Sequence, residues 1–237
     1  MESIFKDIRF VGLDLDDTLY DRNRVYEKVF LIMESIVKSN VSFNQFNNIY
    51  QQYSIAEFNN YVKGKKDKYS YQVDRVIRSY NEFGKNIEEN QAIIFNALYE
   101  YYRNNIELRP NAQEFINKLI GLGYEPFILT NGPSSGQWGK IRALGLDKLI
   151  NKNYIFVSDD LGVSKPDKKI FEYVQEKLSA SANEIIYIGD HLDNDILAAI
   201  ENQWNAIYFG DSKSIHENDH YFVVNDFSDL IKLFQDN

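Results

Sequence analysis

The chain has 237 residues, of which 44% are hydrophobic and 15% aromatic, and this composition supports a real core and argues against wholesale disorder. The net charge of −9 argues against a general nucleic-acid binder, and the absence of cysteine excludes disulfides, thiolate metal sites and cysteine nucleophiles. Residues 1–7 carry acids and no apolar signal core, and no stretch approaches the roughly 18 apolar residues of a membrane span, so we expect a soluble, cytoplasmic protein.

The first chemical feature is the stretch of residues 10–20, where a short apolar run ends in three carboxylates and a threonine. The run predicts a buried parallel strand, with Asp14, Asp16 and Thr18 at its C-terminal tip, where open α/β sheets bind ligands. Because neighbouring carboxylates repel one another, a cation or a shared proton is expected there. The alternative interpretation is a turn or a helix cap, since Asp and Thr favour both.

Residues 20–103 are predicted to be entirely helical. Apolar residues recur at helical spacing over residues 25–38, 42–61, 71–80 and 88–103, and strand-like alternation is absent. The lysine-rich residues 63–68 are expected to form an exposed turn, and Arg75 and Arg78 are expected to face water.

From residue 106 onward, strands alternate with helices. The strands are expected at residues 126–130, 154–157, 184–190, 206–209 and 221–224, and the helices at residues 112–123, 135–145, 168–179, 193–203 and from 228. This alternation predicts an α/β fold, a Rossmann-like doubly wound parallel sheet. The chain therefore divides into an α/β core, residues 1–19 and 104–237, and an inserted helical cap, residues 20–103.

Other strand ends supply further polar groups to the same edge of the sheet. They are Thr130-Asn131-Gly132, Lys165 in a loop after the third strand, and Asp190 with Asp195. Taken singly, these residues are equally typical of turns, exposed loops and helix caps. Together they converge where phosphate-type ligands bind.

The chemistry indicated is phosphoryl transfer. Asp14 can attack phosphorus and form an aspartyl-phosphate, and Asp14 with Asp190 can supply oxygen ligands to Mg²⁺. Thr130 and the backbone N–H groups after it can hold phosphate oxygens, and Lys165 can neutralise charge on the transferring group. Asp16 can protonate the leaving alcohol and then deprotonate water, which requires a proton at working pH. The crowding of carboxylates predicts a raised pKa for Asp16.

These motifs resemble those of the haloacid dehalogenase (HAD) superfamily of phosphohydrolases, in the branch with a helical cap inserted after the first motif. The four motifs occur in order, as Asp14, Asp16 and Thr18, then Thr130, then Lys165, then Gly189, Asp190 and Asp195. The resemblance implies that Asp14 is the nucleophile and Asp16 the acid/base. It implies a Mg²⁺ site of Asp14, Asp16 through its carbonyl, Asp190 and Asp195, with Asp195 acting through water or orienting Lys165. The phosphate-binding set would be Thr18, Thr130, Asn131, Gly132 and Lys165.

The resemblance also bears on the substrate. The acidic side chain at position 16 favours a phosphate ester over an organic halide as the substrate. The spacing around Thr130 and Lys165 is similar to that of pyrimidine 5'-nucleotidase-like members. The first hypothesis is therefore a Mg²⁺-dependent phosphatase, with a nucleoside 5'-monophosphate as the substrate. The main alternative is a sugar-phosphate phosphatase or phosphomutase. Less favoured alternatives are a haloacid dehalogenase and a non-catalytic phosphate-binding or signalling protein.

The expected partner is a small phosphorylated metabolite, with neither a nucleic-acid polymer nor a membrane, and the expected state is a monomer or homodimer. Hinges are expected near Tyr20 and residues 103–106, where closure would exclude water.

Overall fold

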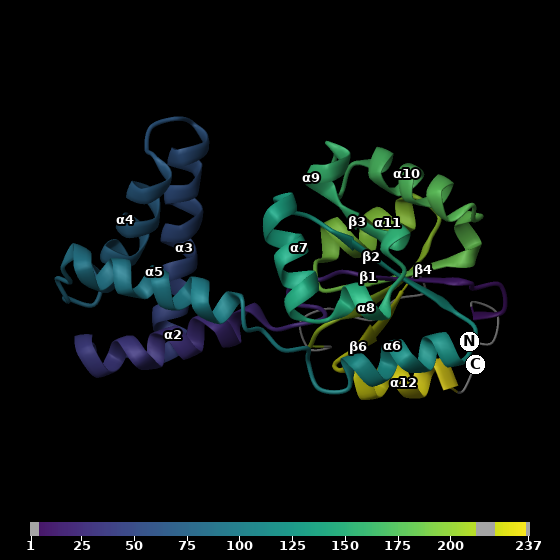
Figure 1. Ribbon diagram of the computed structural model, residues 1–237, viewed down its shortest axis with the longest axis horizontal. Helices are drawn as coiled ribbons and strands as arrows, with labels where there is room; N and C mark the ends of the chain where they lie inside the picture. Colours follow the sequence, from purple (N-terminus) through teal and green to yellow (C-terminus); the bar gives the residue numbers. More distant parts are fainter. Residues whose placement is uncertain (1–4, 212–220, 236–237) are drawn as a thin grey trace. The chain divides into compact units, whose positions relative to one another are not determined.

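The computed structural model describes residues 5–211 and 221–235 (Figure 1). The chain divides into two compact units, an α/β unit of Met1–Asp21 with Ile106–Asn237 and a helical unit of Arg22–Asn105. Both boundaries of the helical unit lie two residues later in the sequence than the predicted boundaries of residues 20 and 103. Residues 1–4, which belong to the N-terminal stretch considered above, lie outside the described residues. The same holds for residues 236–237, the last two of the predicted closing helix.

In the described part of the α/β unit, one six-stranded parallel sheet has the order β3-β2-β1-β4-β5-β6. The strands are β1 (Phe10–Leu13), β2 (Glu125–Thr130), β3 (Ile155–Val157), β4 (Ile185–Gly189), β5 (Asn205–Phe209) and β6 (Phe222–Val224). Strands β1 and β4 are buried throughout, as continuous apolar runs in parallel sheets usually are. The order reverses at β1, which lies between β2 and β4 and so marks the topological switch point. The predicted Rossmann-like α/β fold is confirmed.

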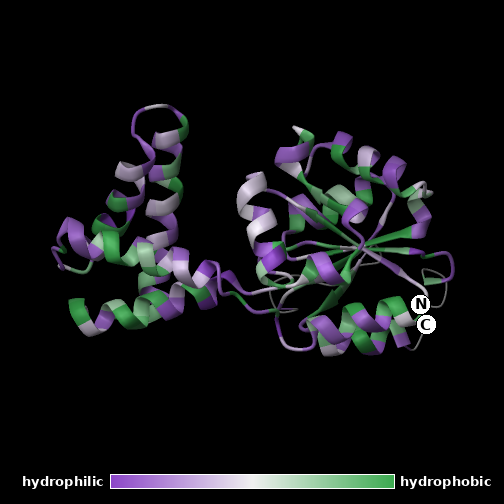
Figure 2. Cartoon of the chain, in the orientation of Figure 1, coloured by the Kyte–Doolittle hydropathy of each residue, from purple (hydrophilic) through white to green (hydrophobic). Residues whose placement is uncertain are grey.

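Helices cover both faces of this sheet. Helices α6 (Ala112–Gly121) and α12 (Phe227–Gln235) lie on one side, and α10 (Lys168–Leu178) and α11 (Ala198–Glu201) lie on the other (Figure 1). Hydrophobic and hydrophilic residues are interspersed along α6 and α12, as expected of helices with one buried face (Figure 2). Phe171, on the buried face of α10, packs edge-on against Trp204 with ring centroids 5.1 Å apart.

Several short elements differ from the predictions. Helix α7 (Ser134–Ala143) corresponds to the predicted helix of residues 135–145, whereas α8 (Leu146–Leu149), α9 (Ser158–Leu161), η1 (Lys152–Tyr154) and η2 (Ala182–Glu184) are additional. Elements of three or four residues are too short to show a hydrophobic period, so α8, α9, η1 and η2 were not predicted. The predicted helix 193–203 is wrong in detail, because a π-helical stretch, η3 (Leu192–Leu197), precedes the single turn of α11.

The helical unit consists of α2 (Arg22–Val37), α3 (Phe43–Val62), α4 (Lys68–Asn81) and α5 (Glu89–Arg103). The predicted all-helical insertion is therefore confirmed. Ser42 is the N-cap residue of α3 and forms a capping box with Gln45, and Asp67 is the N-cap residue of α4, where its side chain accepts from the Ser70 N–H. Aromatic side chains fill the interior, where Phe46, Tyr80 and Phe95 are fully buried. None of the described helices has both the length and the apolar character required to cross a membrane.

The expectation that Arg75 faces water is wrong. Its guanidinium carbon lies 5.4 Å from the ring centroid of Tyr50 and 5.7 Å from that of Tyr71, and Nε is buried. Aromatic faces attract a guanidinium and provide part of the environment that water would otherwise supply. Arg78 is exposed, as expected, although its guanidinium also donates to Glu57.

Candidate active site

The predicted site residues gather at the carboxyl ends of the central strands. Asp14 directly follows β1, Thr130 ends β2, and Asp190 directly follows β4. The Asp14 N–H donates to the Ile188 carbonyl at 2.9 Å, which continues the β1–β4 pairing one residue past the end of β1. Because these three strands are parallel neighbours, their ends bring together residues up to 176 positions apart in the chain.

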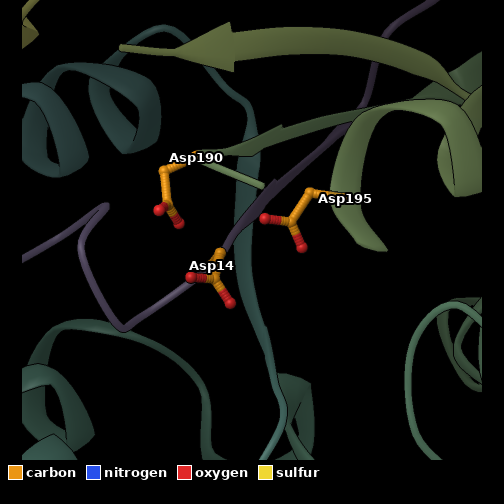
Figure 3. A group of neighbouring side chains, drawn as sticks. All are labelled: Asp14, Asp190 and Asp195. Atoms are coloured by element: carbon orange, nitrogen blue, oxygen red, sulfur yellow. The ribbon is translucent and has the colours of Figure 1, made fainter. Parts of the chain in front are cut away.

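Three carboxylates converge there. Asp14, Asp190 and Asp195 each place a carboxylate oxygen within 4.8 Å of the other two (Figure 3). Asp195 comes from η3 and accepts a hydrogen bond from the His191 N–H at 3.0 Å. A Cβ atom added at Gly189 would lie 2.4 Å from Asp195 Oδ2, so only glycine lets this carboxylate approach the end of β4.

Lys165 is almost completely buried among these acids. Its ammonium donates to Asp14 Oδ1 at 2.7 Å, to Asp195 Oδ1 at 2.6 Å and to the Tyr187 hydroxyl at 2.7 Å. These contacts use all three ammonium protons. The backbone of Lys165 is held as well, since the Asn131 side chain donates to the Lys165 carbonyl at 2.8 Å and accepts from the Lys165 N–H at 2.9 Å. The position of the ammonium is therefore determined from both ends of the residue.

Burial and mutual repulsion disfavour the charged forms of the acids. Burial, opposed by Lys165 and reinforced by Asp195, raises the pKa of Asp14. Burial, with the negative charges of Asp17 and Asp195, raises the pKa of Asp190 to about 6. Burial alone would lower the pKa of Lys165, but Asp14 and its other partners raise it well above its ordinary value.

The donor set fits a divalent metal ion. Among the described residues, the Lys165 ammonium pairs with Asp14 and Asp195, and one cation beside three carboxyl groups leaves room for a further positive charge. Carboxylate oxygens are the ligands that hard divalent cations prefer. Asp14, Asp190 and Asp195 together can therefore hold such an ion.

The predicted phosphate-binding residues already have protein partners. The buried Thr18 hydroxyl donates to Asp190 Oδ1 at 3.3 Å, and the Thr130 hydroxyl accepts from Gln137 at 2.5 Å. The Gly132 N–H donates to the Ser158 hydroxyl at 3.0 Å. A phosphate oxygen bound by Gly132 N–H would have to replace Ser158 as its acceptor.

The predicted rise in the pKa of Asp16 is wrong. Its carboxylate accepts hydrogen bonds from the Tyr20 hydroxyl, from Gln137 Nε2 at 2.8 Å and from Lys140 Nζ at 2.5 Å. Burial alone would raise the pKa of Asp16, but the Lys140 ammonium and these hydrogen bonds hold it below the ordinary value. The prediction counted only the neighbouring acids, whereas the decisive cation lies 124 residues later in the sequence.

Three residues of this site were given no role in it by the sequence analysis, namely Gln137, Lys140 and Tyr187. Gln137 and Lys140 are three residues apart and so lie on one face of α7, directly after β2, which is the signal that could have identified them. Tyr187 lies in the middle of an apolar strand and looks like a core aromatic. Its hydroxyl instead links Lys165 to the Leu129 carbonyl, to which it donates at 2.6 Å.

This chain is similar to a known protein family, to several characterised relatives and to solved structures. A family model described as haloacid dehalogenase-like hydrolase matches residues 8–202. Relatives named glyceraldehyde 3-phosphate phosphatase come from several archaea, and the Methanocaldococcus jannaschii protein is 26% identical over 203 residues, covering 82% of this chain and 81% of its own. The pyrimidine 5'-nucleotidase PynA of Streptococcus pneumoniae is 24% identical over 201 residues, 83% of each chain. A magnesium-bound crystal structure of the putative hydrolase YfnB from Bacillus subtilis, described as revealing interdomain movement, matches with a TM-score of 0.68 at 22% identity, over 96% of this chain and 99% of YfnB.

Proposed function

Since this chain belongs to the haloacid dehalogenase-like hydrolase family, we propose that it is a Mg²⁺-dependent phosphatase that hydrolyses a small sugar-phosphate monoester. The observation that carries this proposal is the buried contact between Asp14 and Lys165 beside the carboxylates of Asp190 and Asp195. It combines a nucleophile, a fixed cation and a set of metal ligands at one point. The glyceraldehyde 3-phosphate phosphatases among its relatives support a phosphorylated triose or similar sugar as substrate.

The reaction proceeds in two displacement steps. A carboxylate oxygen of Asp14 forms a bond to phosphorus while the phosphorus–oxygen bond to the sugar breaks. Asp16, whose pKa is lowered in the free site and which must therefore take up a proton before this step, gives that proton to the departing oxygen. Water then gives a proton back to Asp16, attacks phosphorus and breaks its bond to Asp14. Inorganic phosphate leaves, and both aspartates return to their starting states.

The other residues orient groups and balance charge. Lys165 stabilises the negative charge that spreads over the transferring phosphoryl group, and Asp195, Tyr187 and Asn131 keep its ammonium in place. Thr130 offers its hydroxyl to a phosphate oxygen. Asp14, Asp190 and the carbonyl of Asp16, with Asp195 near them, would hold Mg²⁺. The bound ion would supply the positive charge that lets a carboxylate approach a phosphate dianion.

Phosphate release from a substrate panel tests the proposal. The panel contains glyceraldehyde 3-phosphate, hexose phosphates, nucleoside 5'-monophosphates and p-nitrophenyl phosphate, each with Mg²⁺ and with EDTA. We expect Mg²⁺-dependent release, with the highest kcat/KM for a sugar phosphate. No release from any ester by folded protein in Mg²⁺ would contradict the proposal.

A nucleoside 5'-monophosphate is the second candidate substrate, because PynA is similar to this chain over most of its length. This was the first hypothesis from the sequence, and the archaeal relatives favour the sugar phosphate over it. A kcat/KM for uridine 5'-monophosphate above that for every sugar phosphate would reverse the order. Conversion of one sugar phosphate into its isomer, without phosphate release, would identify a phosphomutase instead.

A further inference from the structure

Side chains from two segments hold the carboxylate of Asp16. Gln137 Nε2 donates to Asp16 Oδ2 at 2.8 Å, and Lys140 Nζ donates to Asp16 Oδ1 at 2.5 Å. The Tyr20 hydroxyl also donates to Oδ1. Both carboxylate oxygens therefore have partners, and hydrogen bonds from helix α7 and from the loop after β1 restrict the rotamer of Asp16.

Gln137 connects Asp16 with the end of β2. The same Nε2 group donates to the Thr130 hydroxyl at 2.5 Å, and Gln137 Oε1 accepts from Lys140 Nζ at 2.8 Å. The side chain is buried, and a Cβ atom added at Gly132 would lie 3.1 Å from Gln137 Cδ, so it also packs tightly. One amide thus links the candidate acid/base to a candidate phosphate-binding residue.

We propose that Gln137 and Lys140 are positioning residues for the acid–base step, which hold the Asp16 carboxylate where it can reach the ester oxygen. This inference rests on the proposed function and concerns the orientation of Asp16. A general acid must lie within hydrogen-bond reach of the oxygen that it protonates. A displacement of about 1 Å can cost on the order of 100-fold in rate. Packing and hydrogen bonds around an acid are the means by which a protein prevents such displacement.

Substrates with different leaving groups distinguish a role of Gln137 and Lys140 in positioning Asp16 from a general structural role. A sugar alkoxide is a poor leaving group and requires the proton from Asp16, whereas p-nitrophenolate can leave without it. Misplacement of Asp16 should therefore slow hydrolysis of a sugar phosphate far more than hydrolysis of p-nitrophenyl phosphate. Damage to folding or to phosphate binding should slow both to a similar extent.

The experiment compares kcat/KM for glyceraldehyde 3-phosphate and p-nitrophenyl phosphate in Mg²⁺, because kcat/KM reports the steps through departure of the leaving group. The variants are Lys140→Met, Gln137→Leu and Lys140→Arg, with Asp16→Asn as the benchmark for loss of the acid. For Lys140→Met we expect a loss of roughly 10- to 100-fold with the sugar phosphate and less than about threefold with p-nitrophenyl phosphate. Gln137→Leu also removes the hydrogen bond to the Thr130 hydroxyl, so it should lower both values, with the larger loss on the sugar phosphate. Lys140→Arg keeps a cationic donor and should keep the ratio of the two values within about threefold of wild type.

Arg142→Met is the matched control, because Arg142 is an exposed cation on the same helix. It should leave the ratio unchanged. Equal losses on both substrates in Lys140→Met and Gln137→Leu would overturn the positioning role and leave the proposed function standing. A gain in kcat/KM for the sugar phosphate would do the same. So would a Lys140→Arg variant that does not preserve the ratio. If the wild type hydrolyses neither ester, the proposed function fails and the inference falls with it.

Discussion

Gly12 shows how a single missing side chain lets the central strand fit between its neighbours. A Cβ atom at this position would lie 2.4 Å from Phe127 Cζ and 2.5 Å from Tyr187 Cδ2. Both rings lie in the packed core of the α/β unit, and Tyr187 also contacts Lys165. The glycine therefore serves the core and indirectly the candidate site.

We predict that Gly12→Ala lowers the free energy of unfolding by about 1–3 kcal/mol, because the methyl group overpacks the core. Urea denaturation followed by circular dichroism measures the change. Gly136→Ala is the control, since nothing lies within 4 Å of a Cβ atom there and the residue is helical. It should be neutral or stabilise the protein by up to about 1 kcal/mol. Equal stability of Gly12→Ala and wild type would show that the two rings move aside without cost.

Asp14 is the residue on which the proposed chemistry depends. We predict that Asp14→Asn reduces phosphate release to the background rate, because an amide oxygen is a poor nucleophile. The fold should persist, since Lys165 keeps hydrogen bonds to Asp195 and Tyr187. Phosphate release and circular dichroism are measured on the same preparation. A folded Asp14→Asn variant that retains activity would refute the nucleophile assignment.

At the scale of elements, helices α3 and α4 are joined by an ionic cluster centred on Glu57. This carboxylate has a side-chain exposure of 0% and accepts from Lys66 at 2.5 Å and from the Arg78 guanidinium. Burial alone would raise the pKa of Glu57, but hydrogen bonds from Lys66 and Arg78 lower it below its ordinary value of 4.5. The charged form of Glu57 is therefore favoured in the folded protein relative to the unfolded chain.

We predict that Glu57→Gln lowers the free energy of unfolding by about 1–3 kcal/mol at pH 7, because charge-assisted hydrogen bonds are lost. A carboxyl group whose pKa is depressed by folding contributes stability above its unfolded pKa and loses it as the pH falls through the folded value. The difference between variant and wild type should thus shrink as the pH falls below 4.5. Urea denaturation at pH 7 and in acid measures both effects.

Glu100→Gln is the control for this prediction. Glu100 pairs with Arg103 on the helix surface, with side-chain exposures of 47% and 33%. Such pairs contribute at most about 1 kcal/mol, so the change should be small at either pH. A loss in Glu57→Gln that is no larger than in Glu100→Gln, or that persists unchanged in acid, would contradict the role assigned to the cluster.

At the scale of the whole molecule, two chain connections join the α/β unit to the helical unit, one at residues 21–22 and one at residues 105–106. We predict that the two units close when the site is filled, which would exclude water during phosphoryl transfer and then open to release product.

Small-angle scattering tests the closure. The protein is measured alone, with Mg²⁺ and with Mg²⁺ plus a phosphate mimic such as beryllium fluoride, and we expect a smaller radius of gyration in the last state. Limited proteolysis near the two connections should slow in parallel. Asp14→Asn serves as the control, because the mimic should no longer attach to it. Identical scattering and proteolysis with and without the mimic would refute the prediction.

The sequence by itself determined the fold class and the identity of most candidate site residues. Hydrophobic periodicity is local, so it distinguishes a buried strand such as residues 10–13 from the helices of residues 22–105. Parallel strands joined by helices place their carboxyl ends on one edge, and polar residues there meet whatever their separation in the chain. Asp14, Thr130, Lys165 and Asp190 could therefore be grouped before any coordinates were known, while their catalytic roles remain predictions.

Only the tertiary structure decided how these groups are partnered. The pairs Lys140–Asp16 and Tyr187–Lys165 join residues 124 and 22 positions apart, and they depend on which face of a helix or strand turns toward the site. The pKa of Asp16 is lowered instead of raised for that reason, since the Lys140 ammonium at 2.5 Å and the hydrogen bonds to the carboxylate outweigh the effect of burial. Arg75 likewise lies among tyrosines from other helices instead of facing water. Side-chain direction and charge environment arise from packing between distant segments, which local sequence patterns do not encode.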